Sequence, residues 1–143
     1  MRKRTLSREA ALKILYASDV TKESIEESCR KFWENNRVSS EDIKSFSEEL
    51  VFGFEKQREN IDRTITSFAK NWALDRMASI DRSILRLASF ELLYERETPP
   101  KVVINEAVEL AKKYGDRDSG KFVNGILDKI KSEVEVSRDD DRE

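Results

Sequence analysis

The 143-residue sequence contains no histidine and a single cysteine, Cys29. Without histidine, the chain cannot form a Ser–His or Cys–His nucleophile pair or a histidine-ligated metal site. One cysteine forms neither an intrachain disulfide nor a thiolate zinc cluster, so Cys29 is expected to be a small buried apolar group. We therefore expect no catalytic residues, no metal and no cofactor.

Glycine and proline are also scarce, with four and two residues respectively. So few chain breaks favour long helices over a sandwich or barrel, which would need many turns. No run approaches the roughly 20 apolar residues that cross a bilayer, and the N-terminus lacks the apolar core of a signal peptide. These absences predict an all-α, cytoplasmic protein.

Charge is balanced overall but uneven along the chain. The formal net charge is −2, so the total indicates no partner class. Residues 1–13 carry five basic side chains and one acidic side chain, and residues 1–6 are predicted to be a basic arm. The C-terminal end is acidic. We expect one helical domain over residues 1–132 and a disordered acidic tail over residues 133–143.

Apolar residues recur at helical spacing through the first half. Ser7 is predicted to cap a helix that ends near Ser18, and the capping-box pair Ser24 and Glu27 opens the next helix. Either Ser39 or Ser40 opens the third. A fourth helix is predicted from residue 60 to residue 72, with Trp72 on its inward stripe.

The segment 77–95 is the most apolar of the predicted helices. Apolar side chains cover more than one of its faces, so it is expected to be central and packed on two sides. Its polar remainder is predicted to lie at the surface: Asp81, Arg82, Arg86, Ser89 and Glu91. Thr98-Pro99-Pro100 ends it, because proline cannot continue a helix.

Residues 101–130 predict two helices joined by a polar elbow. Gly115 is expected to end the first helix in the left-handed conformation, and Asp118 or Ser119 to cap the second. Two readings remain open. The elbow is a solvated turn with Phe122 in the core, or an anion site where Lys121 adds charge and Phe122 stacks on a base.

The segment GDRDSGK, residues 115–121, also matches part of a phosphate-binding P-loop. The next residue is Phe122, where that motif requires Ser or Thr for magnesium. A predicted helix precedes the loop, where the motif requires a strand. Nucleotide hydrolysis is therefore not expected.

Three segments resemble the bacterial NusB family of transcription antitermination factors. They are REAALKILY at residues 8–16, ILRLASFEL at residues 84–92, and KVVINEAVELAKKYGDRDSGKFVNGILDK at residues 101–129. The resemblance implies two packed three-helix units plus an N-terminal helix. It also implies that the protein binds the single-stranded boxA element of nascent RNA with NusE, a small-subunit ribosomal protein. The resemblance further implies that the complex joins RNA polymerase in antitermination, including on ribosomal RNA operons.

The resemblance also assigns residues. Arg4 and Arg8 match the family's basic RNA-binding positions, and Arg2 and Lys3 match their character. The elbow residues that face RNA are Asp118, Lys121 and Phe122. Tyr16 and Asp81 fall where the family meets NusE. Gly120 replaces a larger polar residue that is frequent in the family.

Two alternatives belong to other functional classes. Some RNA cytosine methyltransferases carry a similar helical recognition domain, although this sequence has no glycine-rich cofactor-binding unit. The chain could also be a helical module that works by forming a homodimer. Asp118 could cap its helix or accept hydrogen bonds from base amino groups, and Asp81 could be an ordinary first-turn acid.

Overall fold

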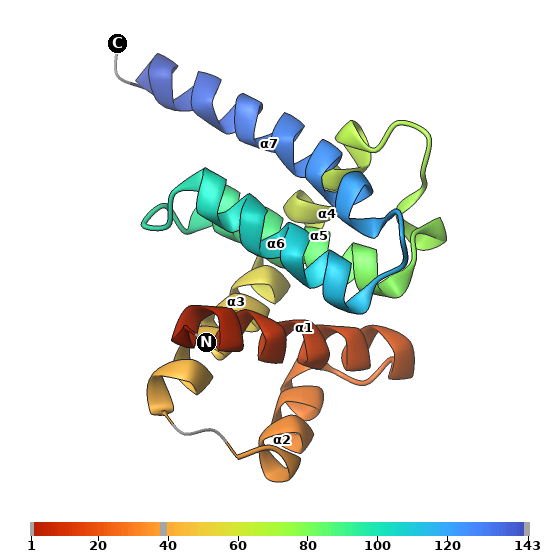
Figure 1. The fold of residues 1–143 in the computed structure, drawn as a ribbon, viewed down its shortest axis with the longest axis vertical. Coiled ribbons are helices and arrows are strands. Elements are labelled where there is room, and N and C mark those ends of the chain that lie inside the picture. The colour runs from red at the N-terminus through yellow and green to blue at the C-terminus, as the bar shows by residue number, and fades with distance from the viewer. Residues whose placement is uncertain (1, 38–39, 142–143) are drawn as a thin grey trace.

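The structure is a computed structural model that describes residues 2–37 and 40–141, with side chains placed up to residue 136. Over these residues the chain forms seven α-helices, one short 3-10 helix and no strand (Figure 1). The prediction of an all-α fold with about seven helices is confirmed. The helices are α1 (Lys3–Thr21), α2 (Ile25–Asn35), α3 (Glu41–Lys56), α4 (Arg58–Phe68), η1 (Leu74–Arg76), α5 (Ser79–Tyr94), α6 (Pro100–Tyr114) and α7 (Ser119–Asp141).

The helices pack in two groups that meet where α1 and α3 contact α5. Helices α5, α6 and α7 all contact one another, and α4 packs on α5 and α7. On the other side, α1 lies along both α3 and α5, and α2 packs on α1 and α3. Figure 1 shows α1 running across the molecule between α2 below and α6 above. No described helix is long and apolar enough to cross a membrane.

Several helix ends form as the sequence predicts. The Ser24 hydroxyl accepts a hydrogen bond from the Glu27 N–H, and the Ser40 hydroxyl accepts one from the Asp42 N–H. Ser39, the alternative cap, lies outside the described residues. Pro100 occupies the first turn of α6, where its missing N–H costs nothing.

The start of α1 differs from the prediction. The helix begins at Lys3, so the predicted basic arm is its first turn. Ser7 is therefore not a cap. It is a buried residue in the interior of α1, and its hydroxyl donates to the Ile43 carbonyl of α3. The Ser47 hydroxyl returns the contact to the Ser7 carbonyl.

Helix α5 is central, as predicted, but its polar residues are not at the surface. Asp81, Arg86, Ser89 and Glu91 are all less than 9% exposed, so that prediction was wrong for them. Arg86 donates to both carboxylate oxygens of Asp62. Arg82 is paired with Asp19 of α1. Arg82, Arg86 and Glu91 can occupy these positions because each finds an opposite charge on a neighbouring helix. Asp81 has no such partner.

The predicted fourth helix is shorter than its apolar pattern. It ends at Phe68, and Trp72 follows in the connection to η1 with 53% of its surface exposed. The prediction of an inward Trp72 was therefore wrong. Ile61 and Ile65 are fully buried and hold the helix on the core. Lys70 and Asn71, which are exposed, mark where the apolar pattern stops being followed.

At the other end, α7 continues to Asp141, across the predicted domain end at residue 132. Val134 is 7% exposed and belongs to the same core. Residues 133–141, where we expected a disordered tail, are therefore helical. Residues 142 and 143 lie outside the described ranges.

Helices α3 and α5 approach closely at Gly53. A Cβ atom at Gly53 would lie 2.2 Å from the Phe90 ring, whereas one at Gly125 in α7 would meet nothing within 4 Å. We expect Gly53→Ala to lower the free energy of unfolding by about 1–3 kcal/mol through overpacking. Gly125→Ala should raise it by up to about 1 kcal/mol through helix propensity. Urea denaturation of both variants checks this, and equal effects would contradict it.

Candidate nucleic-acid interface

The first turn of α1 presents three basic side chains to solvent. Arg2, Lys3 and Arg4 are all exposed. Lys3 forms an exposed ion pair with Asp42 at 3.3 Å, which contributes little stability and exchanges readily for another anion. The Arg4 guanidinium lies 3.7 Å from the centre of the Phe46 ring. That contact positions the charge without neutralising it.

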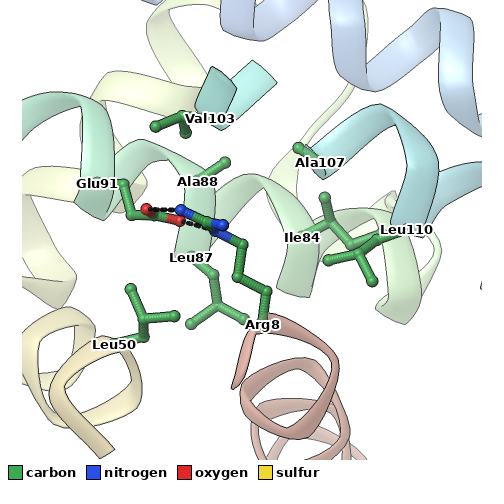
Figure 2. A pocket seen from close by; sticks show the side chains of 9 residues that line it. All are labelled: Arg8, Leu50, Ile84, Leu87, Ala88, Glu91, Val103, Ala107 and Leu110. Atoms are coloured by element: carbon green, nitrogen blue, oxygen red, sulfur yellow. Dashed lines mark hydrogen bonds and ion pairs between the residues drawn. The ribbon is translucent and has the colours of Figure 1, made fainter. Parts of the chain in front are cut away.

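Arg8, also predicted to contact RNA, is in a different environment. Its side chain is only 6% exposed and donates two hydrogen bonds to Glu91, at 2.8 and 2.9 Å (Figure 2). A further 3.3 Å contact reaches Glu106. Two carboxylates therefore already neutralise this guanidinium inside the protein. The structure does not support the interpretation of Arg8 as a phosphate contact.

The cavity around Arg8 is too small for a ligand. It lies among α1, α3, α5 and α6, and Figure 2 shows the Arg8 side chain crossing it toward Glu91, with apolar side chains on the other sides. Its volume of about 10 Å³ is no more than a single water needs. Its role is to enclose the ion pair.

The elbow between α6 and α7 is held by Asp116. One oxygen of its carboxylate accepts the Asp118 N–H at 2.8 Å and the Ser119 hydroxyl at 3.3 Å. The Ser119 hydroxyl in turn accepts the Asp116 N–H at 3.0 Å. These bonds close a compact turn at the start of α7, so the turn is formed before any ligand arrives.

This arrangement leaves Asp118 free of a capping role. Its carbonyl accepts the Phe122 N–H as the helix starts, but its exposed carboxylate makes no hydrogen bond or ion pair to residues 2–37 or 40–136. Lys121 is likewise exposed and unpaired over the same residues. The structure therefore does not show Asp118 capping its helix.

Phe122 lies between the two predicted environments. It is half-buried against the core, and its ring meets Trp72 edge-on, with centroids 6.2 Å apart. Complete burial would have removed it from any interface. Half-burial allows one side of the ring to contribute to packing and leaves the other accessible.

Gly115 ends α6 without the predicted left-handed conformation. Its φ is −93°, and that prediction was wrong. Glycine is needed there because a Cβ atom would lie 2.4 Å from the Ser119 hydroxyl oxygen. Gly120 is buried beside the Lys112 side chain, 3.3 Å from where its Cβ would be, so this position presents no polar group.

The first turn of α1 and the elbow do not touch. They lie along one edge of the protein, where α1 packs beside α6. Successive contacts pair Thr5 with Glu106 and Glu9 with Lys113 and Tyr114, so α1 and α6 run in the same direction. In Figure 1 the start of α1 and the α6–α7 elbow lie at opposite ends of this edge. Exposed Lys13 lies near the elbow, 5.9 Å from the Tyr114 ring.

The two positions assigned to NusE differ in exposure. Tyr16 is 39% exposed on α1, whereas Asp81 is 7% exposed at the start of α5. One Asp81 carboxylate oxygen, Oδ1, has no hydrogen-bond partner among the described residues. Burial raises the pKa of the Asp81 carboxyl, the Ser119 hydroxyl opposes this, and the charge of Asp116 adds to it.

Comparison with known proteins identifies the family of the chain. The NusB family model matches residues 5–132. The chain belongs to the NusB family. A relative from Anaeromyxobacter dehalogenans, named transcription antitermination protein NusB, is 46% identical over 140 residues and is covered over 98% of both chains. The NusB relative from Trichlorobacter lovleyi is 47% identical over 126 residues, covering 88% of each.

Solved NusB structures share the fold. T. maritima NusB superposes with a TM-score of 0.83 at 35% identity, covering 93% of this chain and 92% of that one. A chain from a crystal structure of NusB and NusE in complex with double-stranded RNA gives a TM-score of 0.85 at 32% identity, covering 92% and 98%. The NusB resemblance that the sequence indicated is therefore confirmed.

Two surface residues beside this NusB-type elbow were not predicted from sequence. Lys13 was counted only as part of the basic N-terminal segment, and Trp72 was assigned to the core. Helical spacing placed Trp72 inward, since it is eleven residues after Ile61. The polar pair Lys70 and Asn71 was the available signal that the helix had already ended.

Because Arg8 neutralises a Glu91 carboxylate that is 3% exposed, Arg8→Ala should lower the free energy of unfolding by about 3–5 kcal/mol. Arg4→Ala removes only an exposed cation–π contact and should cost no more than about 1 kcal/mol. Urea denaturation separates the two. The double variant Arg8→Met/Glu91→Leu should recover most of the loss. A stable Arg8→Ala protein would contradict the structural role.

Asp81 makes a pH-dependent prediction. Since its folded-state pKa is raised, the folded protein holds the proton more tightly than the unfolded chain, and ionisation opposes folding as pH rises. Asp81→Asn should therefore raise the free energy of unfolding at pH 7, with the gain vanishing near pH 3. Exposed Asp128→Asn is the control and should change stability little at either pH. Equal gains for Asp81→Asn at pH 7 and pH 3 would refute this account.

Proposed function

We propose that this protein is a non-enzymatic antitermination factor that binds the boxA element of nascent RNA together with NusE. It would act within the RNA polymerase antitermination complex, including on ribosomal RNA operons, and hence in the cytoplasm. The observation that carries the proposal is the elbow. A free carboxylate, an unpaired lysine and an accessible aromatic ring surround a preformed helix N-terminus.

Each elbow residue has a role in binding single-stranded RNA. Phe122 offers a ring face to a splayed base, the usual way in which proteins read unpaired RNA. Lys121 and the free N–H groups at the start of α7 attract a phosphate. The Asp118 carboxylate, which has no intramolecular partner, accepts hydrogen bonds from base amino groups.

The first turn of α1 extends the interface. Arg2, Lys3 and Arg4 would neutralise phosphates, with Lys13 between them and the elbow. From Arg4 to Lys13 the helix rises about 14 Å, which about four nucleotides cover at a stacked spacing of about 3.4 Å. One RNA segment would therefore run along α1. Arg8 supports this path from beneath, by fixing α1 on α5 and α6.

Tyr16 and Asp81 are the proposed NusE contacts. Half-exposed Tyr16 offers the large amphipathic surface typical of interface centres. The unpartnered Oδ1 of Asp81 is a buried acceptor that an arginine of NusE could satisfy. Asp81 would then lower the stability of the free protein and gain a partner on binding NusE, as residues at functional sites often do.

A gel-shift experiment tests the function. The protein is mixed with boxA-containing RNA or a scrambled RNA, each with and without NusE. We expect preference for boxA, strengthened by NusE. Methyl transfer to RNA would instead support the recognition domain of a methyltransferase. Dimerisation in sedimentation without any RNA or NusE binding would support a dimerisation module, whereas a homodimer that releases its RNA-binding surface is compatible with the proposal.

The α1 phosphate contacts predict a specific salt dependence. Arg4→Ala should weaken boxA binding at low salt and reduce the slope of log affinity against log salt by about 0.7–1, the value of one phosphate contact. Arg63→Ala removes an exposed arginine of α4 and should leave the slope unchanged. Filter binding at several salt concentrations gives both slopes. An unchanged slope for Arg4→Ala would exclude this residue from the interface.

A further inference from the structure

An aromatic surface lies beside the elbow, formed by two segments far apart in the sequence. Trp72 comes from the connection between α4 and η1, and Phe122 from the first turn of α7. Their rings meet edge-on at 6.2 Å and an interplanar angle of 78°. Trp72 is 53% exposed, so most of the indole is not used to cover the core. A contact of this geometry covers at most one face of the indole.

The segment that carries Trp72 is held in place from several directions. The backbone N–H of Trp72 donates to the Ala69 carbonyl at 3.0 Å, which closes a turn after α4. Beyond the tryptophan, the Arg82 guanidinium donates to the carbonyls of Leu74 and Met77 at 2.9 and 3.1 Å. Arg82 also pairs with Asp19 of α1. Trp72 is therefore presented on an ordered support, so binding it costs little conformational entropy.

We propose that Trp72 is a second RNA-stacking residue, and that Trp72 and Phe122 together form a platform for two neighbouring unpaired bases. The inference rests on the proposed function and extends it to a residue outside the elbow. Base–aromatic stacking is tolerant of base identity. Trp72 would therefore add affinity, while Asp118 beside it would contribute the choice of base.

The charges around the platform favour RNA over a protein partner. Four basic side chains on the two segments are exposed and form no ion pair with other described residues: Lys70, Arg76, Arg117 and Lys121. The same segments carry three acids, Asp75, Asp116 and Asp118, so the basic side chains outnumber them by one, and Asp116 already accepts two hydrogen bonds of the turn. Available cations beside stacking rings and a helix N-terminus suit a phosphate backbone and its bases.

The experiment measures binding of boxA RNA, with NusE present, to full-length variants. Trp72→Ala should lower RNA affinity by about 5- to 150-fold, the range for one stacked base. Trp72→Phe should retain most of the affinity, because a ring remains. The salt slope should be unchanged for both, because no phosphate contact is lost. Phe52→Ala, at a 40% exposed aromatic of α3, is the control and should bind as the unaltered protein does.

Fluorescence gives a readout independent of any loss of stability. The protein has two tryptophans, so Trp33→Phe leaves Trp72 as the only one. Its emission should be quenched in proportion to bound boxA RNA. The measurement uses NusE without tryptophan, so that all tryptophan emission comes from Trp72, and this NusE alone should not quench it.

The outcomes separate this inference from the proposed function. If boxA RNA binds the unaltered protein but Trp72→Ala binds equally well and Trp72 emission does not change, the platform is refuted and the function stands. If Trp72→Ala loses NusE and keeps RNA, the surface belongs to a protein partner and the inference is also overturned. If the unaltered protein binds no RNA with or without NusE, the proposed function itself fails, and the platform with it.

Discussion

The bidentate ion pair between Arg8 and Glu91 is the interaction on which the arrangement of this protein depends. It joins α1 to α5 inside the core, and the contact of Arg8 with Glu106 adds α6. A buried ion pair contributes little net stability, because desolvation offsets the attraction. Its geometry is strict, however, and misplacing either helix would leave a buried charge unpaired. The pair therefore fixes how α1 lies on the C-terminal helices, which a purely apolar contact would specify less tightly.

That placement determines which face of α1 meets solvent. With Arg8 directed inward, Arg4 and Lys13 lie at the exposed edge, and Glu9 can accept hydrogen bonds from Lys113 and Tyr114 at the end of α6. Burial alone would raise the pKa of the Glu9 carboxyl, but these two donors hold it below its usual range. Glu9 therefore stabilises the folded protein above its unfolded-state pKa, and this contribution is lost as pH falls through the folded one. The same contact ties the basic edge of α1 to the elbow.

The sequence was sufficient for the helices and insufficient for their polar contacts. Apolar spacing, serine caps and the Pro99-Pro100 break located the elements because those signals are local. Glu91 and Arg86 were expected at the surface because their partners, Arg8 and Asp62, are distant in sequence and no local pattern reveals them. Trp72 was misplaced because the helical spacing of apolar residues continues in the sequence beyond Phe68, where the helix ends. The elbow was predicted as a site, yet its internal cap, Asp116 rather than Asp118, depends on the conformation of the turn.

Because separate residues hold the turn and face solvent, the elbow would need no rearrangement to bind RNA in the proposed way. Asp116 and Ser119 satisfy the polar groups of the turn, which releases the Asp118 carboxylate and Lys121 from structural roles. Gly115 permits Ser119 to approach, since any side chain there would occupy the position of the hydroxyl. Phe122 is held on one side by the core and by Trp72. Groups fixed in this way lose little entropy on binding, so more of each proposed stacking and phosphate contact would become net affinity for RNA.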